Sequence, residues 1–295
     1  MNVIVVGSGA REHALCRILH KSYLCEKVFC FPGNYGISQI AECKDISTKE
    51  DIVEECIKIN PDLVVVGPEN YLSENLAGEL RNKGLNVFGP DSEGAKLESS
   101  KEFMKEFCQS HNIPTAKSQT FVDFDEAKNY LESFNGPIVV KYDGLAAGKG
   151  VFVCTNTNEA IEACERIFIK KEFNQENNKV VIEEFIEGKE LSFFTITDGN
   201  EYLNIGSAQD YKRVGNNDTG PNTGGMGTIS PAPILDNNLD MIIQDQIVKK
   251  TIEGLKHDNI AFQGVIFFGI IVNEHNQPYL LAVSYTHLRA HETGC

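Results

Sequence analysis

The sequence lacks an apolar run long enough to cross a bilayer. Its longest such stretch, around Gly264 to Val272, is far shorter than the roughly 20 residues that a spanning helix needs. The first residues form an apolar strand pattern, without the charged segment and cleavage site of a signal peptide. These absences argue against a transmembrane or secreted protein, and we expect a soluble, cytoplasmic chain with no membrane partner.

Cys-x-x-Cys pairs are also absent. The nine cysteines are an odd number, and several stand singly inside periodic segments, such as Cys16, Cys56, Cys108 and Cys164. This pattern is typical of small buried hydrophobic residues in a reducing compartment. It argues against a disulfide framework and against a cysteine-based zinc site.

Positive charge is scarce. Lys and Arg number 27 against 42 Asp and Glu, which gives a net charge of −15 in 295 residues and a pI of about 4.9. Such a balance repels phosphate backbones, so a nucleic-acid partner is not expected. Any anionic substrate must be held by a local cluster of Lys, Arg and backbone N–H groups. The length allows about two domains.

Strand and helix patterns alternate over the first third of the chain. The expected strands are residues 2–6, 27–31, 63–66 and 86–88, and the expected helices are 11–21, a segment capped by Ser47, and 74–83. This order is typical of an α/β fold with a doubly wound parallel sheet. Because Gly89-Pro90 marks a boundary, we expect a Rossmann-like domain over residues 1–100.

A mixed α+β pattern follows over residues 101–283. The expected helices are a segment capped by Ser99, then 123–133, 158–169 and 239–255; the expected strands are 138–142, 151–154, 180–185, 191–197, 201–205, 265–272 and 279–283. The polar segment 209–233 predicts a loop, which at that length is usually functional or disordered.

The first strand ends in a glycine-rich turn, residues 7–12 (GSGARE), that opens a helix and directs free N–H groups at one spot. Glu12 stands where a dinucleotide fingerprint has its third glycine, and Pro32-Gly33-Asn34 stands where an acidic residue would hold a ribose. We therefore expect no nicotinamide cofactor. A tight structural turn and an anion site remain equally open.

Residues 141–151 (KYDGLAAGKGV) carry a stronger signal. Lys141 ends a strand, a loop of small residues follows, and a second strand begins directly after Lys149-Gly150. Small side chains let backbone amides approach a triphosphate, while the two lysines supply charge. It is not a Walker A loop, because no Ser or Thr and no helix follow Lys149. We expect this loop to bind phosphates.

Two further segments are weaker indicators on their own. Residues 182–190 (IEEFIEGKE) leave one strand and enter another, where backbone groups could pair with an adenine edge. Residues 209–227 (QDYKRVGNNDTGPNTGGMG) place glycines, cations and hydrogen-bonding side chains in one segment, which suits either a ligand-wrapping loop or a disordered linker.

Taken in order, these segments resemble the phosphoribosylamine–glycine ligase (glycinamide ribonucleotide synthetase) family of ATP-grasp enzymes. The matching stretches are 5–15 (VVGSGAREHAL), 32–34 (PGN), 66–69 (VGPE), 141–151, 183–185 (EEF) and 209–227. The resemblance extends from the first residue to about Leu281. It implies a pre-ATP-grasp domain followed by an ATP-grasp domain.

The resemblance also implies roles for individual residues. Lys101 and Lys141 would reach the nucleotide phosphates, and Lys141 and Arg213 would be catalytic. The remaining ATP-binding candidates are Asp143, Gly144, Ala147, Gly148, Lys149 and Gly150 in the covering loop, Glu183, Glu184, Phe185 and Ile186 around the adenine, and Glu190 on the ribose. The candidates for the glycine and phosphoribosylamine pocket are Gly9, Arg11, Asn34, Asp210, Lys212, Arg213 and Gly224.

The implied reaction is ATP-driven amide formation, in which glycyl phosphate forms and the amine of 5-phosphoribosylamine displaces phosphate. Positioning and cations would support it, without a Ser-His-Asp triad. The family binds Mg²⁺ through a Glu and an Asn two residues apart. Ala282 and Ser284 stand at these positions here, and neither is a credible ligand. We therefore expect little turnover from this chain.

Residues 284–295 match nothing expected of the family, and we expect them to be foreign sequence replacing a longer native chain. His287 and His291 have i, i+4 spacing, which we attribute to chance, and the other histidines are scattered. No metal site is therefore expected. A non-catalytic nucleotide-binding protein and another ATP-grasp carboxylate–amine ligase remain alternative functions.

Overall fold

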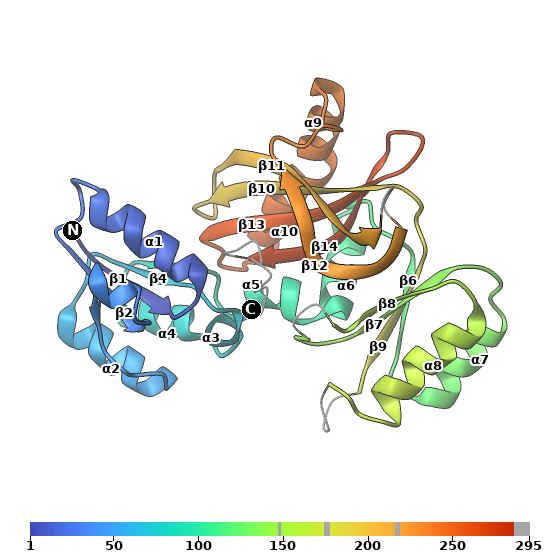
Figure 1. Ribbon diagram of the computed structural model, residues 1–295, viewed down its shortest axis with the longest axis horizontal. Helices are drawn as coiled ribbons and strands as arrows, with labels where there is room; N and C mark the ends of the chain where they lie inside the picture. Colours follow the sequence, from blue (N-terminus) through green and yellow to red (C-terminus); the bar gives the residue numbers. More distant parts are fainter. Residues whose placement is uncertain (147–148, 174–177, 216–218, 286–295) are drawn as a thin grey trace.

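The computed structural model describes residues 1–146, 149–173, 178–215 and 219–285. Within these ranges, the side chains of residues 212, 213, 219–222, 224 and 225 are not described. Three sheets lie side by side along the molecule, with the N-terminal sheet at one end (Figure 1). Among the described residues, no helix has both the length and the apolar character that a membrane span requires.

The N-terminal sheet is parallel, in the strand order β3-β2-β1-β4-β5. Its strands are β1 (Asn2–Gly7), β2 (Lys27–Pro32), β3 (Glu42–Cys43), β4 (Leu63–Val66) and β5 (Val87–Phe88), and its helices are α1 (Ala10–Lys21), α2 (Lys49–Ile59), α3 (Glu69–Ser73) and α4 (Leu76–Asn82). Cys16 of α1 packs on one face, and Ile52 of α2 and Leu80 of α4 pack on the other. Helices on both faces confirm the predicted doubly wound fold.

The second sheet is antiparallel, in the order β6-β9-β7-β8. Its elements are β6 (Ser118–Phe121), α7 (Phe124–Glu132), β7 (Ile138–Tyr142), β8 (Val151–Cys154), α8 (Thr157–Phe168) and β9 (Val180–Glu184). Leu131 of α7 and Cys164 of α8 share a core with Val140 and Ile182 of the sheet. One face of this small sheet is therefore covered by two helices.

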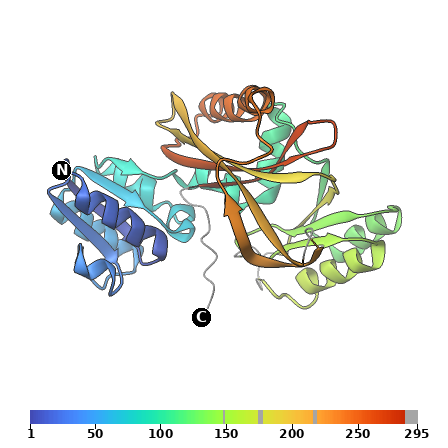
Figure 2. The same ribbon diagram turned by 45° about the horizontal axis from the view of Figure 1, so that its top comes forward.

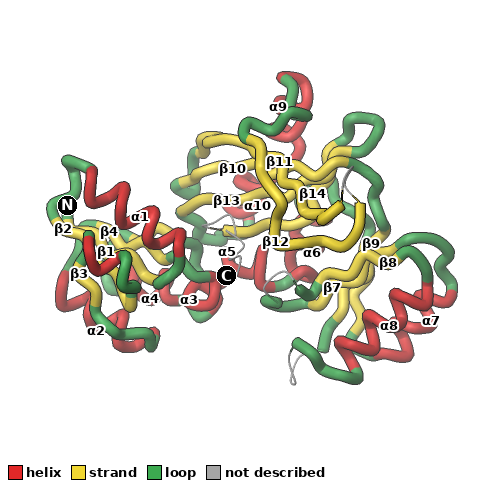
Figure 3. The backbone as a smooth tube through the Cα atoms, viewed as in Figure 1, coloured by secondary structure: helices red, strands yellow, loops and turns green. Residues whose placement is uncertain are grey.

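The third sheet is also antiparallel, in the order β12-β11-β10-β13-β14 (Figure 3). Its strands are β10 (Lys189–Thr197), β11 (Tyr202–Gly215), β12 (Thr219–Ile229), β13 (Gly264–Val272) and β14 (Pro278–Tyr285). The helical segments associated with this sheet are α5 (Ser92–Ser99), α6 (Lys101–Ser110), α9 (Asn237–Ile243), the π-helical η2 (Gln244–Val248) and α10 (Lys249–His257). The remaining helical segment, the 3₁₀ turn η1 (Ile37–Gln39), connects β2 to β3 in the N-terminal part.

Three sequence-based expectations were wrong in detail. The polar segment 209–233 is not a loop over most of its length, because β11 and β12 extend through it as a long hairpin. Its glycines and polar residues hide the strand alternation that sequence reasoning needs. The caps are Thr48 and Ser100 instead of Ser47 and Ser99, and α5, which precedes Ser100, was not expected.

A single buried cluster connects the first sheet to the third. It contains Ile4 and Val66 of the N-terminal sheet, Ala95 of α5, and Phe268 and Val283 of the third sheet. Both views place α5 between these two parts of the molecule (Figures 1 and 2). The N-terminal and third sheets therefore share one hydrophobic core, whereas the second sheet packs around a separate core of its own.

The turn between β1 and α1 closes around Glu12, a side chain that is almost fully buried. Its Oε2 atom accepts a hydrogen bond from the N–H of Gly9 at 2.7 Å, which completes a capping box. A Cβ on Gly7 would lie 2.7 Å from Glu12 Cγ, and a Cβ on Gly9 would lie 2.8 Å from Glu12 Oε2. The glycines are therefore needed to make room for this carboxylate. Its oxygen occupies the position from which a bound anion would accept a hydrogen bond from the same N–H.

We predict that Gly67→Ala destabilises the fold. A Cβ at this position would meet the Glu12 carboxylate and would lie 2.8 Å from the carbonyl oxygen of Val6, which belongs to the backbone and cannot move aside. Overpacking of this kind costs about 1–3 kcal/mol. Chemical denaturation should report this loss, whereas Gly227→Ala, whose Cβ meets no atom within 4 Å, should leave stability almost unchanged. Equal stabilities for the two variants would contradict this account.

Candidate active site

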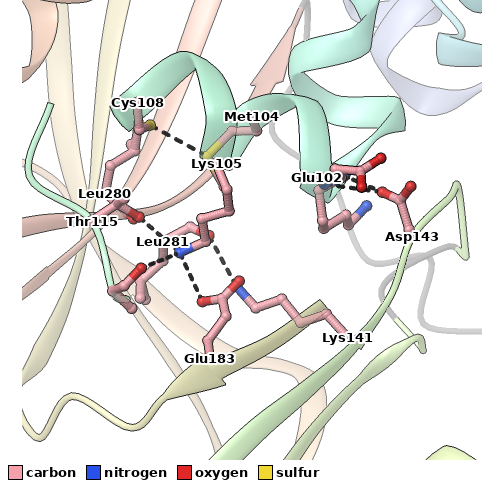
Figure 4. A network of polar contacts seen from close by, with 12 residues as sticks. Glu102, Met104, Lys105, Cys108, Thr115, Lys141, Asp143, Glu183, Leu280 and Leu281 are labelled. Carbon is pink, nitrogen blue, oxygen red and sulfur yellow. Dashed lines mark hydrogen bonds and ion pairs between the residues drawn. The ribbon is translucent and has the colours of Figure 1, made fainter. Parts of the chain in front are cut away.

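Two lysines converge on one buried carboxylate where the second sheet meets α6 (Figure 4). Lys141 Nζ of β7 lies 2.8 Å from Glu183 Oε1, and Lys105 Nζ of α6 lies 3.0 Å from Glu183 Oε2. The side chains of Lys141, Lys105 and Glu183 are only 8%, 6% and 2% exposed, respectively. The cluster carries a net positive charge of one in a largely buried setting, which suits the recognition of an anion.

Neutral oxygens from two segments surround the lysines: β14 supplies one to Lys141, and the segment between α6 and β6 supplies two to Lys105. Lys141 Nζ donates a hydrogen bond to the carbonyl of Leu281 at 3.1 Å. Lys105 Nζ donates to Thr115 Oγ1 at 2.8 Å and to the carbonyl of Ala116 at 3.1 Å. Thr115 Oγ1 in turn donates to the carbonyl of Leu280 at 2.6 Å. The second and third sheets thus meet at this lysine pair.

Burial is the main influence on the Lys105 ammonium. Desolvation lowers its pKa, the negative charge of Glu183 opposes this shift, and the positive charge of Lys141 adds to it. The carboxylate of Glu183 therefore favours the charged form of Lys105 against the effect of burial.

Asp143 ties the start of the glycine-rich loop to the N-terminus of α6. Its Oδ1 atom accepts hydrogen bonds from the N–H groups of Lys101 at 2.5 Å and Glu102 at 3.2 Å, and from the hydroxyl of Ser100 at 3.1 Å. A carboxylate is favoured at this positive end of a helix. Asp143, expected at the ATP, therefore acts first as a cap that positions the loop.

Lys101 lies at the same junction. Its Nζ atom donates to the carbonyls of Glu98 at 3.1 Å and Gly144 at 3.0 Å, so its positive charge is beside the loop. Gly150 closes the loop, since its carbonyl accepts from the N–H of Tyr142 at 2.8 Å, and Lys149 N–H donates to Ala146. Ala147 and Gly148 lie outside the described residues.

The expected adenine and ribose contacts follow β9. Glu184 accepts a hydrogen bond from the N–H of Lys117 at 2.9 Å, and Phe185 is 39% exposed. Ile186 is half-buried, and Glu190 is exposed at the start of β10. The structure therefore brings this segment to the same end of the sheet as Glu183, whose own side chain faces the lysines.

Candidates for the second substrate fall in two places. At the β1–α1 turn, Asn34 Nδ2 donates a hydrogen bond to the carbonyl of Ser8 at 2.7 Å. The Arg11 guanidinium lies 4.0 Å from Glu69 Oε2. The Gly9 N–H is already used by Glu12. Asp210, on β11, is half-buried and accepts from Thr228 at 3.4 Å. Lys212, Arg213 and Gly224 lie in β11 and β12, but their side chains are outside the described part.

Residues 1–98 match the N domain of phosphoribosylglycinamide synthetase, and residues 99–287 match its ATP-grasp (A) domain. The chain belongs to the phosphoribosylglycinamide synthetase family. It is 47% identical over 269 residues to the chloroplastic phosphoribosylamine–glycine ligase of Arabidopsis thaliana, and 44% identical over 274 residues to that of Brucella melitensis. These alignments cover 90% and 92% of this chain but 51% and 64% of the relatives.

Solved structures agree with this assignment. The phosphoribosylamine–glycine ligase of Thermotoga maritima superposes with a TM-score of 0.82 at 30% identity, covering 97% of this chain and 69% of that one. A biotin carboxylase domain from Hydrogenobacter thermophilus superposes with a TM-score of 0.73 at 18% identity, over 98% of this chain and 65% of that one. The latter likeness concerns the ATP-grasp fold alone. The chain spans between about a third and two thirds of the length of the curated relatives that it matches.

Sequence reasoning missed Lys105 as a site residue. The apolar pairs Phe103 with Phe107 and Met104 with Cys108 indicated an amphipathic helix, and Lys105 was given no role in it. The available signal was spacing, because residues four apart lie on the same side of a helix and Lys105 follows Lys101 by four. Only the position of Glu183 distinguishes this buried lysine from an ordinary surface one.

The donor set at the expected metal position does not fit Mg²⁺. Ala282 and Ser284 lie in β14 just after Leu281, whose carbonyl accepts a hydrogen bond from Lys141. Ala282 offers no ligand atom, and Ser284 offers one neutral hydroxyl. Magnesium requires near-octahedral oxygen ligands that normally include a carboxylate. The nearby carboxylate of Glu183 already neutralises two lysines.

We predict that Glu183→Ala destabilises the protein by about 3–5 kcal/mol, because it leaves two buried ammonium groups without a counter-charge. Urea denaturation should report the loss. Glu187→Ala, in the exposed turn directly after β9, is the matched control and should change stability by less than about 0.5 kcal/mol. Adding Lys105→Met to the Glu183→Ala chain should restore part of the stability, and failure to do so would contradict the charge argument.

Proposed function

We propose that this chain carries the nucleotide-binding machinery of an ATP-dependent ligase that joins glycine to 5-phosphoribosylamine, a step of purine synthesis. The observation that supports this most directly is the pair Lys105 and Lys141, held by Glu183 beside the glycine-rich loop. Family membership and the names of the relatives support the choice of substrates. We also propose a cytoplasmic location.

The reaction consists of two balanced transfers. A carboxylate oxygen of glycine attacks the γ-phosphorus of ATP, the bond to the β,γ-bridging oxygen breaks, and ADP leaves. The amine nitrogen of phosphoribosylamine then attacks the carbonyl carbon of glycyl phosphate, inorganic phosphate leaves, and the nitrogen loses a proton. Both steps develop negative charge on phosphate oxygens, so preorganised cations are the main requirement.

Each proposed role rests either on a contact described above or on the position of the residue in the family's motifs. Lys141 and Lys105 would neutralise phosphate oxygens, with Lys101 at the base of the loop. Residues 143–150 would cover the phosphates, residues 183–186 would line the adenine, and Glu190 would accept from the ribose. Asp210 would pair with the glycine ammonium, and Gly9, Arg11, Asn34, Lys212, Arg213 and Gly224 would complete the pocket.

A non-catalytic nucleotide-binding protein is the alternative that one observation favours, namely Ala282 and Ser284 at the positions of the family's metal ligands. We propose that this chain binds adenine nucleotides and ligates glycine only slowly. Rapid ADP release that requires both glycine and phosphoribosylamine would contradict slow turnover. Equal rates with other amino acids would instead favour a different carboxylate–amine ligase.

We predict that Lys141→Met weakens ATP and ADP binding by about 10- to 100-fold, because a charge-assisted hydrogen bond to phosphate contributes about 1.5–3 kcal/mol. Isothermal titration calorimetry on folded protein would measure this loss. Lys128→Met is the matched control, because this lysine is on the exposed surface of α7. The affinity of this variant for ATP and ADP should not change. Unchanged affinity in Lys141→Met would overturn the proposed nucleotide site.

We also predict that the double change Ala282→Glu, Ser284→Asn makes ATP binding depend on Mg²⁺. The variant would supply a carboxylate and an amide oxygen beside Lys141, which are suitable magnesium ligands. Titration of ATP with and without Mg²⁺ should give a larger difference in the variant than in the parent chain. An equal response in both proteins would refute the idea that these two positions limit metal binding.

A further inference from the structure

Two histidines and one aspartate meet far along α6 from the lysine cluster. His111, the C-cap of α6, lies with Nε2 at 2.8 Å from Asp258 Oδ2. His257, the last residue of α10, lies with Nδ1 at 2.8 Å from Asp258 Oδ1. One ligand atom from each of the three residues lies within 4.8 Å of the other two. Residues 146 positions apart in the sequence thus form one polar cluster.

Both helices end here in the same way, which fixes the backbone under two of the three side chains. Asn112 and Asn259 follow the caps His111 and Asp258 with φ values of 53° and 56°. The next residues, Ile113 and Ile260, donate hydrogen bonds back to the carbonyls of Cys108 and Leu255 at 2.8 Å each. These are Schellman motifs. The negative ends of two helix dipoles therefore converge on the cluster, which favours a cation.

The His111 ring is held in place by its surroundings. It packs against Phe107 with the ring centroids 4.6 Å apart, and its side chain is only 14% exposed. A Cβ on Gly254 would lie 2.8 Å from both Cγ and Cδ2 of this ring. A glycine inside a helix costs about 1 kcal/mol relative to alanine. In α10 it opens the space that the imidazole occupies, so one potential ligand is preorganised.

We propose that His111, His257 and Asp258 bind a divalent transition-metal ion such as Zn²⁺. Two imidazole nitrogens, one carboxylate oxygen and a water molecule form a common tetrahedral set, with bonds of about 2.0–2.2 Å and ligand atoms about 3.3 Å apart. With Oδ2 of Asp258 as the carboxylate ligand, its 2.8 Å separation from His111 Nε2 must widen by about 0.5 Å, and His257 Nδ1 must leave Oδ1 and turn toward the same ion. His257 is 80% exposed and free to turn, so it makes this adjustment while His111 stays in place.

This site is separate from the proposed nucleotide chemistry. It joins the C-terminal end of α6 to α10, whereas Lys101 and Lys105 lie in the first half of α6. Lys250 of α10 donates to the carbonyl of Asn112 at 2.6 Å, and the ion pairs that the described residues form with Asp258 come from His111 and His257. A bound metal would fasten the helix that carries the phosphate-facing lysines to the helical layer of the third sheet.

Titration of the full chain with Co²⁺ tests the proposal. Cobalt in a tetrahedral site of nitrogen and oxygen ligands has visible ligand-field bands, whereas binding to any of the nine cysteines would add a strong thiolate charge-transfer band in the near ultraviolet. We expect saturable visible bands at one equivalent without the thiolate band. Excess Zn²⁺ should remove these bands by competition.

Three variants identify the ligands. His257→Ala and His111→Gln should each weaken Co²⁺ binding by at least about 10-fold. His257 is exposed, so its variant carries little risk to the fold, and it decides the test if His111→Gln is unstable. His275→Ala is the matched control, since this exposed histidine pairs with Glu274 and is not part of the cluster of His111, His257 and Asp258. Full affinity in His257→Ala, or a thiolate signature in the parent chain, overturns the site.

Discussion

The architecture of the site depends on one carboxylate that neutralises two buried ammonium groups. Glu183 enters from β9, Lys141 from β7 and Lys105 from α6, and β14 supplies the carbonyl that completes the Lys141 coordination. Removing water from two like charges is unfavourable unless an opposite charge is placed between them. The second sheet, the helix and the third sheet are thus held in a single relative position by the same ions that face the proposed phosphates.

Helix α6 is the element that connects these features. Asp143 caps its N-terminus and anchors the glycine-rich loop, Lys105 lies in its middle, and His111 caps its C-terminus against α10. Its apolar side, with Met104 and Phe107, belongs to the core shared with the N-terminal sheet. A single amphipathic helix therefore connects the glycine-rich loop, the lysine cluster and the proposed metal position to the core shared with the N-terminal sheet.

The proposed site combines lysines placed for phosphate with a β14 segment that offers few metal donors. The proposed phosphate recognition uses lysines from β7 and α6, Leu281 of β14 and the loop after β7, of which residues 143–146, 149 and 150 are described. Magnesium coordination needs two side chains on β14, and Ala282 and Ser284 do not provide them. The glycine turn at β1 is likewise not a simple anion site, because Glu12 supplies its own carboxylate to the N–H of Gly9.

Local patterns determined much of this protein. The β-branched run at β4 and the alternation around it predict a parallel sheet, and the small residues after Lys141 predict a phosphate loop, because both signals depend on neighbours in sequence. The β11–β12 hairpin, the burial of Lys105 and the meeting of His111 with Asp258 were decided only by tertiary structure. Each depends on a partner far along the chain, and no periodicity or spacing within one segment specifies which distant residue will lie opposite it.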